Sequence, residues 1–386
     1  MWNKIINPFF IYCSTWLLVI YLISLKLTTN ISLLNYKGII IILFNILSGF
    51  FIYFLLLPLK NRSNKTFDII PSIKHLEVAY KFANKCFYIF IFLTLVDFIY
   101  SGGMPLLWLF TGSDKNYYNL GIPSIKGFQY TMYLFSLTIF SLILKYKKFN
   151  NWKFKMTIMF FLPFIMLARG LMIYSIFQVF CVVMFNKKIL VKQFRNILIF
   201  IILLILIFGL IGDIRGTSAN PFAFLVNDSF DNPLLKLPSG FTWIYIYITA
   251  NFNNILITIG TFKPSYSLLD VFYNLIPGFF KQFFVTEDIT SPLITDASLN
   301  VASFYAGYVT SFGVIGAIIG GTVLQFFSTY YYFKAKNNNI GYLVAYSIMF
   351  TCLILSVFFD AFLTVSTFCQ LFLSIYLAKK LNKINI

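Results

Sequence analysis

Arginine is scarce in this sequence, and two of its four copies stand apart from the other basic residues. Arg169 and Arg215 each precede a glycine at the end of an apolar run, whereas Arg62 and Arg195 lie in lysine-rich stretches. A guanidinium group near membrane depth is unfavourable without a partner, and its planar fork binds phosphate or carboxylate through paired hydrogen bonds. We therefore interpret Arg169 and Arg215 as phosphate-binding candidates. Snorkelling to the headgroups, or an ion pair such as Arg215 with Asp213, is the alternative.

Two acidic residues are our candidates for catalysis. A general base needs one carboxylate within hydrogen-bond reach of its substrate, and the chain offers twelve acids. Asp213 stands out because it shares the stretch GDIRG with Arg215, and Asp360 because it lies in the middle of the apolar run 340–378. A solvated loop carboxylate, or a hairpin turn in the case of Asp360, is the alternative interpretation.

Tyrosines give a third set of candidates. Tyr245, Tyr247 and Tyr305 could stack on sugar rings. A belt of aromatic residues at the membrane interface would explain them equally well. Both interpretations place these residues near the surface of the membrane.

Several other chemistries are excluded by missing residues. His75 is the only histidine and lies in a lysine-rich stretch, so histidine-based catalysis and histidine-rich metal sites are not expected. The five cysteines form no Cys-x-x-Cys pair. The sequence contains no P-loop, no nucleotide-binding glycine motif after a strand and no Gly-x-Ser-x-Gly motif. We therefore expect neither a metal ion nor a cofactor.

The elements that must position these residues are membrane-spanning helices. Of 386 residues, 59% are hydrophobic and 11% are charged, and the mean hydropathy is +0.82. Soluble domains are about 45–50% apolar and about 25% charged, so a soluble globular enzyme is excluded. We predict an all-α, polytopic helix bundle that forms a single membrane domain over residues 1–386. Ten spans are expected near 8–25, 38–59, 86–101, 128–144, 156–168, 171–185, 196–212, 302–330, 340–358 and 361–378.

The connections between these spans are uneven. The run 156–185 is long enough for one tilted helix, but Arg169-Gly170 in its middle favours two short spans joined by a tight turn. Two outer loops are expected at 102–127 and 213–301. The second loop contains semi-apolar stretches at 241–260 and 268–284, which we interpret as helices in the membrane interface or packed on the bundle. A further pair of spans, giving twelve, is the alternative.

The basic residues are distributed unevenly between the two sides of this predicted topology. With the N-terminus in the cytoplasm, the inner segments hold 21 of the 30 basic residues and two of the twelve acids. Lysine and arginine concentrate in cytoplasmic loops of membrane proteins, so we predict an N-in, C-in orientation and an even number of spans. The net charge of +18 is then explained by orientation and by anionic lipid headgroups, and no nucleic-acid partner is expected.

Five stretches, in their order along the chain, resemble the Wzy-type O-antigen (oligosaccharide repeat unit) polymerases of the bacterial inner membrane. They are GGMPL…YYNLGIPSIKG, LARGLMIYSIFQ, GDIRG with a long outer loop behind it, YIYITANFNN, and FYAGYVTSFGVIGAIIGG. Two positions depart from the family pattern. Ser311 stands where an acid often precedes the late Phe-Gly, and Ala250 stands where proline is common.

The resemblance implies a glycosyltransferase that uses no nucleotide sugar. Such enzymes transfer the growing glycan from undecaprenyl diphosphate to the terminal sugar of an incoming lipid-linked repeat unit, at the periplasmic face. It implies that Arg169 and Arg215 bind the diphosphate and that a carboxylate activates the acceptor hydroxyl. The implied partners are undecaprenyl-diphosphate-linked oligosaccharide and membrane lipids, with a polysaccharide chain-length regulator as a further candidate.

Three alternatives stay open from the sequence. An O-antigen ligase would share this architecture but relies on an outer-loop histidine, whereas His75 is on the predicted inner side. A lipid-linked oligosaccharide flippase would be expected to have more spans and evenly short loops. A membrane acyltransferase would be expected to carry a catalytic histidine or arginine on the cytoplasmic side.

Overall fold

The computed structural model places most of the chain. It describes residues 6–29, 35–60, 72–115, 119–122, 124–185, 222–227, 231–261, 263–281, 283, 302–337 and 339–385, and positions 195, 199, 202–203, 205–206, 209–210 and 212–213. The regular structure in these residues is helical, apart from an isolated bridge between Thr28 and Val226. The all-α prediction is therefore confirmed for the described part of the chain.

Helices occupy nine of the ten predicted spans, and the tenth, 196–212, lies mostly outside the described residues. The corresponding helices are α1 (Pro8–Ser24), α2 (Tyr36–Leu56), α3 (Ile73–Ser101), α5 (Ile125–Leu144), α6 (Trp152–Ile165), α7 (Arg169–Met184), α12 (Ala306–Ala335), α13 (Ile340–Leu355) and α14 (Val365–Asn382). Four shorter or peripheral helices complete the set, namely α4 (Pro105–Thr111), α9 (Ser239–Thr261), α10 (Leu268–Phe272) and α11 (Gly278–Lys281).

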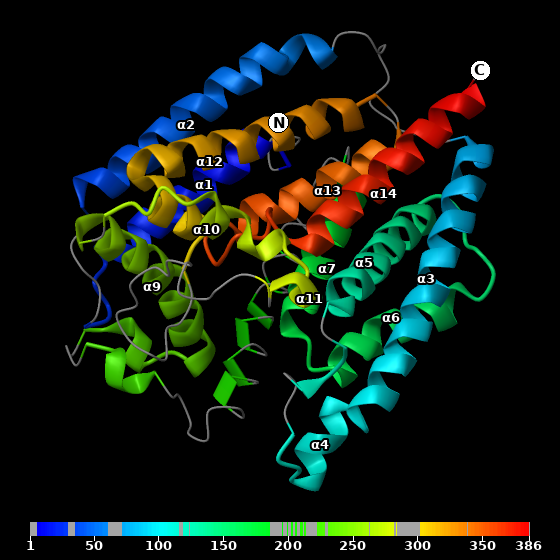
Figure 1. Cartoon of the computed structure of the whole chain (residues 1–386), viewed down its shortest axis with the longest axis horizontal. Helices are drawn as coiled ribbons and strands as arrows, with labels where there is room; N and C mark the ends of the chain where they lie inside the picture. Colours follow the sequence, from blue (N-terminus) through cyan, green and yellow to red (C-terminus); the bar gives the residue numbers. More distant parts are fainter. Residues whose placement is uncertain are drawn as a thin grey trace.

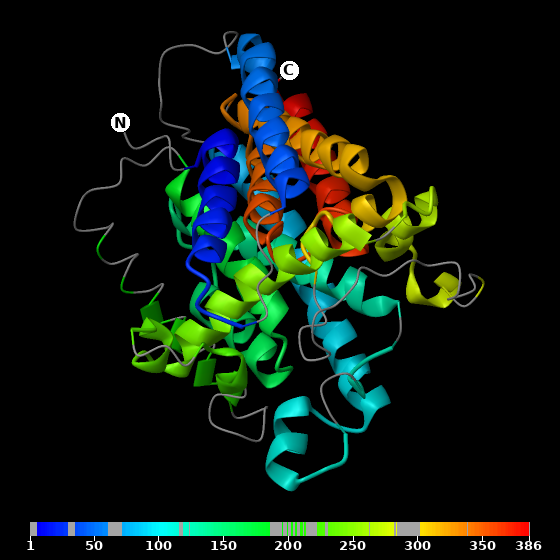
Figure 2. The same ribbon diagram turned by 90° about the vertical axis from the view of Figure 1, so that its left-hand side faces the viewer.

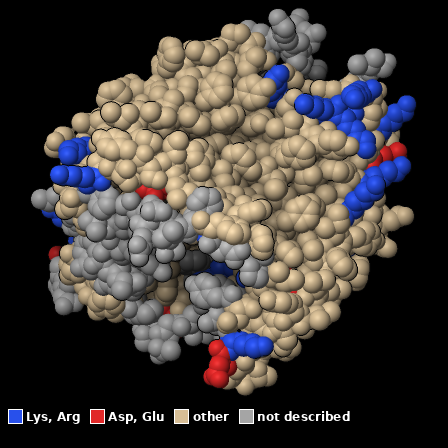
Figure 3. Space-filling view, viewed as in Figure 1, with Lys and Arg blue, Asp and Glu red and all other residues tan. Residues whose placement is uncertain are grey.

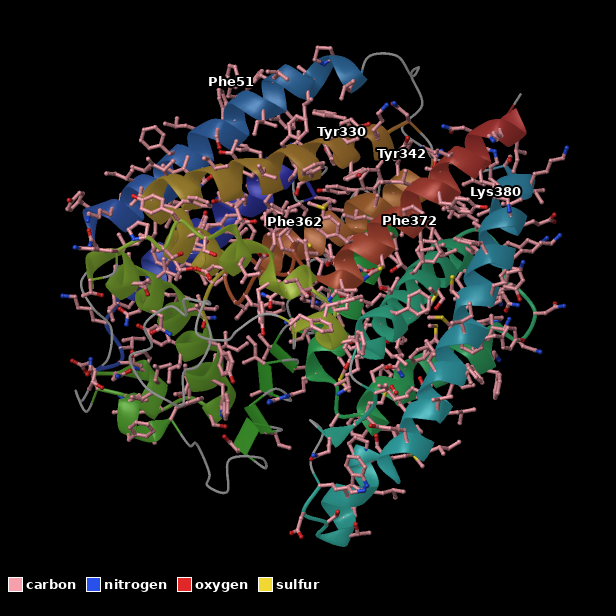
Figure 4. All side chains as sticks on the ribbon, viewed as in Figure 1. Phe51, Tyr330, Tyr342, Phe362, Phe372 and Lys380 are labelled. Atoms are coloured by element: carbon pink, nitrogen blue, oxygen red, sulfur yellow. The ribbon has the colours of Figure 1, made fainter. Side chains whose placement is uncertain are left out.

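Several of these helices are long and apolar enough to cross a membrane. Four stretches meet both criteria: 36–59, 73–108, 125–144 and 306–335. Helices α1, α7 and α13 are shorter but also apolar. Large apolar side chains also point away from the protein: Phe51 of α2 is 66% exposed and Phe372 of α14 is 70% exposed (Figure 4). This is the construction of a helical membrane protein, in which the apolar surface faces lipid.

Helix α13 forms the centre of the bundle. It packs against α1, α7, α12 and α14, and almost all of its residues are buried (Figures 1 and 2). Helices α2 and α12 approach closely because small residues face polar ones: Gly49 lies against Gln325, whose Nε2 donates to Asn45 O at 2.7 Å. Gly321 in turn lies against the Asn45 side chain. The small residues of the GAIIGG stretch (316–321) therefore let α12 approach α2 closely.

The tight turn predicted at Arg169-Gly170 is confirmed. Helix α6 ends at Ile165 and α7 begins at Arg169, and Leu167 between them has a φ of +51°. A non-glycine residue in this left-handed region is uncommon and marks an abrupt reversal. The run 340–378 is divided in the same way, with Asp360 in the connection between α13 and α14.

Helix α12 is broken near its beginning, where the sequence predicted a continuous span. Gly313 has φ +62° and ψ −146°, which only glycine adopts readily. The segment before α10 compensates the break, because Ser265 N–H and Tyr266 N–H donate to the carbonyls of Thr310 and Ser311, each at 2.9 Å. A broken helix is tolerated at membrane depth when neighbouring protein satisfies its backbone in this way.

Helix α9 covers the 241–260 stretch and packs on the bundle, which is one of the arrangements expected for that stretch. It contacts α1, α2 and α12, and Figure 1 shows it crossing the direction of α2 and α12. Tyr245 Oη donates to Leu22 O and accepts from Leu27 N–H, both at 3.0 Å, which ties α9 to the end of α1. The 268–284 stretch contains only the short helices α10 and α11.

Lys155, in the first turn of α6, is buried, although in the predicted topology it belongs to the basic residues of the inner segments. Its Nζ donates to Tyr80 Oη at 2.9 Å and to Asn84 Oδ1. Five aromatic ring centroids lie between 5.0 and 5.9 Å from it. Cation–π attraction and hydrogen bonds therefore replace the hydration that burial removes.

Replacing Lys155 by methionine should lower the thermal unfolding temperature of the purified protein. The substitution removes the buried donor of Tyr80 and Asn84, and an unsatisfied buried polar group costs about 1–3 kcal/mol. Lys153→Met is the matched control, because Lys153 is exposed on the same helix turn. Equal unfolding temperatures for the two variants would contradict the assignment of Lys155 as an internal anchor.

Candidate functional site

Arg169 begins α7 directly after the tight turn. Its side chain is half-buried. Its backbone N–H donates to Leu167 O at 3.1 Å, and the next two residues lie in the first turn, where helical N–H groups lack partners within the helix. The helix dipole adds positive charge at the same place. Arg169 and the N-terminus of α7 therefore both favour an anion.

Three helices begin at this end of the bundle. Helices α5, α7 and α14 run parallel, because contacts join them at two levels in the same order along the chain. Gln178 of α7 accepts from Thr138 of α5 and donates to Gln370 of α14, both at 2.9 Å. The end of α5 meets the end of α7 where Lys145 Nζ donates to Phe185 O at 3.4 Å, and the starts of α5 and α14 are hydrogen-bonded to each other. All three N-termini therefore point the same way. Three parallel helix dipoles add their positive ends at one surface.

The first two turns of α5 contact the starts of α7 and α14. Thr131 Oγ1 of α5 donates to Ser366 O of α14 at 3.1 Å. Tyr130 of α5 packs on the same small cluster as Met166 and Ala168, which form the turn before α7. The N-termini of α5, α7 and α14 therefore form one continuous surface, which we call the N-terminal cluster (residues 125–131, 169–175 and 365–367).

Asp360 lies beside the N-terminal cluster, in the connection that leads into α14. Its Oδ1 accepts from Phe362 N–H at 2.9 Å and from Leu363 N–H at 3.0 Å. The ring of the preceding Phe359 is 6.1 Å from the ring of Tyr174, on the second turn of α7. The structure therefore brings Asp360 and the start of α7 together, two features that the sequence had singled out separately.

Burial changes the acidity of Asp360. Removal from water raises the pKa of its carboxyl group to about 7, and the two backbone N–H donors oppose this rise. Desolvation disfavours the charged form of a carboxylate, while hydrogen bonds to that form stabilise it. A carboxyl group with a pKa near 7 can both accept and release a proton at neutral pH.

Lys126 is a basic residue of this site that sequence reasoning missed. It occupies the second position of α5, is half-buried, and interacts electrostatically with Asp97 of α3. In the predicted topology Lys126 is simply a basic residue at the end of the outer loop 102–127. Its position one residue into a span, like that of Arg169 at the start of α7, is the signal that could have identified it.

The other predicted phosphate-binding and catalytic residues lie elsewhere or are not placed. Arg215 falls outside the described residues. Asp213 accepts hydrogen bonds from Ser239 Oγ and, at 2.8 Å, from Trp243 Nε1. Both of its oxygens are therefore engaged with the first turns of α9, and not with the N-terminal cluster. In this arrangement Asp213 fastens the chain to α9, and its catalytic role stays a prediction.

Two of the three predicted sugar-binding tyrosines are buried inside the protein. Tyr305 has no exposed surface, and its Oη contacts Tyr12 Oη and Asn45 Nδ2, the latter at 3.3 Å. Tyr245 is buried between α9 and α1. Tyr247 is partly exposed and stacks on Trp243 with a centroid separation of 5.7 Å. Only Tyr247 presents a partly open ring, so sugar binding by Tyr245 and Tyr305 would require their contacts to open.

Basic side chains on the face shown in Figure 3 gather near the C-terminal end of α14 and the start of α3, away from the N-terminal cluster. Among the described residues, no group of His, Cys, Asp and Glu side chains could hold a metal ion.

Comparisons with known proteins give no assignment. No protein-family model, no curated protein and no solved structure matches this chain. The fold and the site define a helical membrane protein with three helix N-termini, two basic side chains and a half-buried carboxyl group gathered at one end of its bundle.

Proposed function

We propose that this protein polymerises lipid-linked oligosaccharide repeat units at the periplasmic face of the bacterial cytoplasmic membrane. The growing glycan leaves undecaprenyl diphosphate and joins the terminal sugar of an incoming undecaprenyl-diphosphate-linked repeat unit. The bond between the anomeric carbon and the diphosphate oxygen breaks, and a glycosidic bond to the acceptor hydroxyl forms. Undecaprenyl diphosphate departs, and the hydroxyl proton passes to a base. The chain is oriented N-in, C-in, with the N-terminal cluster facing the periplasm.

The observation that carries this proposal is the positive character of the N-terminal cluster. Arg169 and Lys126 occupy the first turns of two of its three helices. Negative charge develops on the diphosphate as its bond to the sugar breaks, and fixed positive groups stabilise that charge without reorganisation. Arginine supplies paired hydrogen bonds to phosphate oxygens, and helix N-termini supply backbone donors. Arg215 is the second arginine that the proposal assigns to the diphosphate.

Asp360 is the candidate base. Its position beside the start of α7 would place it near the sugar whose diphosphate is bound there. A pKa of about 7 leaves a large fraction of the carboxyl group ionised at neutral pH, ready to accept the proton of the acceptor hydroxyl. The acceptor sugar would occupy the space next to the α13–α14 connection.

An apolar protein surface lies beside this site and would face the lipid part of the substrate. Phe368 and Phe372 are exposed on α14, within two turns of its N-terminus (Figure 4 labels Phe372). A prenyl chain in the outer leaflet could follow this face while its diphosphate reaches the N-terminal cluster. The substrate would then be held by its diphosphate and its chain together, which orients the reacting sugar.

Deletion of the gene tests the proposal in cells. The deletion strain should display lipid A core capped with a single repeat unit, and the ladder of longer glycans should disappear on electrophoresis. Reintroducing the intact chain should restore the ladder. Accumulation of lipid-linked repeats on the cytoplasmic side would contradict the proposal, because that outcome identifies a flippase.

A further inference from the structure

A short strap, defined as residues 119–122, is fastened to the end of α3 next to the N-terminal cluster. Ile122 N–H donates to Asp97 Oδ1 at 3.1 Å, and Gly121 N–H donates to Ser101 Oγ at 2.7 Å. Asp97 has no exposed surface, so the attachment lies inside the protein. Buried hydrogen bonds of this kind hold a loop firmly, because releasing them would leave buried polar groups without partners.

Gly121 permits the strap to lie directly on the carboxyl group. Its φ is +84°, and a Cβ atom at this position would lie 2.9 Å from both Cγ and Oδ2 of Asp97. Real Cβ atoms essentially never come so close to another heavy atom. Any larger residue at position 121 would therefore push the strap away from α3.

The other contact of the strap is with the turn that precedes Arg169. Leu120 is buried, with 3% of its surface exposed, and it packs with Trp108 and Met166 in a small cluster separate from the main core. Ala168 packs against the same cluster. Because Met166 and Ala168 belong to the turn between α6 and α7, Leu120 supports the backbone from which Arg169 projects.

We propose that Asp97 is a positioning residue, which fixes Arg169 through the strap. Asp97 holds Ile122, Leu120 packs on the turn, and the turn sets where α7 begins. Because the strap covers Asp97, this carboxyl group does not touch the substrate. The inference rests on the proposed function, in which Arg169 binds the diphosphate.

The surroundings of Asp97 identify its conservative replacement. Gln129 of α5 interacts with the Asp97 carboxyl group, and both Gln129 Oε1 and Asp97 Oδ2 are buried without a hydrogen-bond partner. Asparagine at position 97 would keep Oδ1 as the acceptor for Ile122. Asp97→Asn should therefore keep the strap in place through the same hydrogen bond.

The test compares polymer formation by four variants at equal amounts of protein in the membrane. Asp97→Ala and Gly121→Ala should lower the polymerisation rate at least tenfold. Asp97→Asn and Gly112→Ala should stay within twofold of the native rate. Gly112 is the matched control, because its φ is +62° but a Cβ there would meet nothing within 4 Å. If the Asp97→Ala protein does not accumulate in the membrane, Gly121→Ala tests the same attachment of the strap with Asp97 intact.

A second readout follows the strap itself. In a background with the native cysteines replaced by alanine, the Leu120→Cys thiol should resist a membrane-impermeant maleimide, and adding Gly121→Ala should expose it. The inference is wrong if Arg169→Ala abolishes polymer while Asp97→Ala and Gly121→Ala change neither rate nor labelling. An equal loss in Asp97→Asn and Asp97→Ala would also overturn it, because it would assign a role to the charge. An unchanged rate in Arg169→Ala would instead refute the proposed function.

Discussion

Arg169→Ala is expected to reduce glycan polymerisation by about 10²–10³-fold, which is the usual effect of removing one donor that stabilises transition-state charge. The half-buried guanidinium lies in the first turn of α7, where helix dipole and side chain act on the same anion. Arg169→Lys should recover part of the rate, because it keeps the charge but loses the paired hydrogen bonds. The measurement is the length distribution of glycans in cells that carry each variant.

The control for this prediction is Arg195→Ala. Arg195 is exposed and belongs to the predicted inner basic stretch, so its loss should leave the glycan ladder unchanged. Immunoblotting of membranes establishes that both variants accumulate equally. A normal ladder in the Arg169→Ala strain would remove the diphosphate-binding role assigned to the N-terminal cluster.

Asp360→Asn is expected to lower the polymerisation rate by about 10²–10⁴-fold, the usual contribution of a general base. The substitution should leave the fold intact, because the asparagine Oδ1 can accept the same backbone hydrogen bonds from Phe362 and Leu363. Asp114→Asn is the matched control at an exposed position of an outer loop. Full activity of the Asp360→Asn enzyme would contradict its assignment as the base.

The pH dependence of polymerisation by the native protein tests the same residue. The base is active when ionised, and burial raises its pKa to about 7. The rate should therefore rise with pH, by about tenfold per unit below pH 7, and level off above it. Asp360→Asn should flatten this part of the profile. A native rate that is independent of pH between 5.5 and 8 would exclude Asp360 as the group that controls the rate.

The sequence predicted the elements that depend on composition and local pattern. Apolar runs marked the positions of nine helices, because a membrane-spanning helix needs a long run of mostly apolar residues. The Arg169-Gly170 pair marked the division between α6 and α7, because a charge and a glycine interrupt an apolar run. Asp360 marked the connection between α13 and α14 for the same reason.

The features that depend on three-dimensional contacts could not be predicted in this way. The break at Gly313 is stabilised by backbone donors some fifty residues earlier in the chain. Lys155 and Lys126 look like topological charges in the sequence, and only the packing of α3 and α5 reveals their burial. Tyr305 is of a residue type common at the membrane interface, but it lies in the core.

Reconstitution of the purified protein with a defined substrate tests the central claim most directly. Liposomes containing the protein and one undecaprenyl-diphosphate-linked repeat unit, without any nucleotide sugar, should yield glycans of increasing length. Each added repeat should release one undecaprenyl diphosphate, and the Arg169→Ala protein should release almost none. Movement of the repeat unit between leaflets without chain growth, or the absence of both glycan growth and diphosphate release, would contradict the assignment as a polymerase.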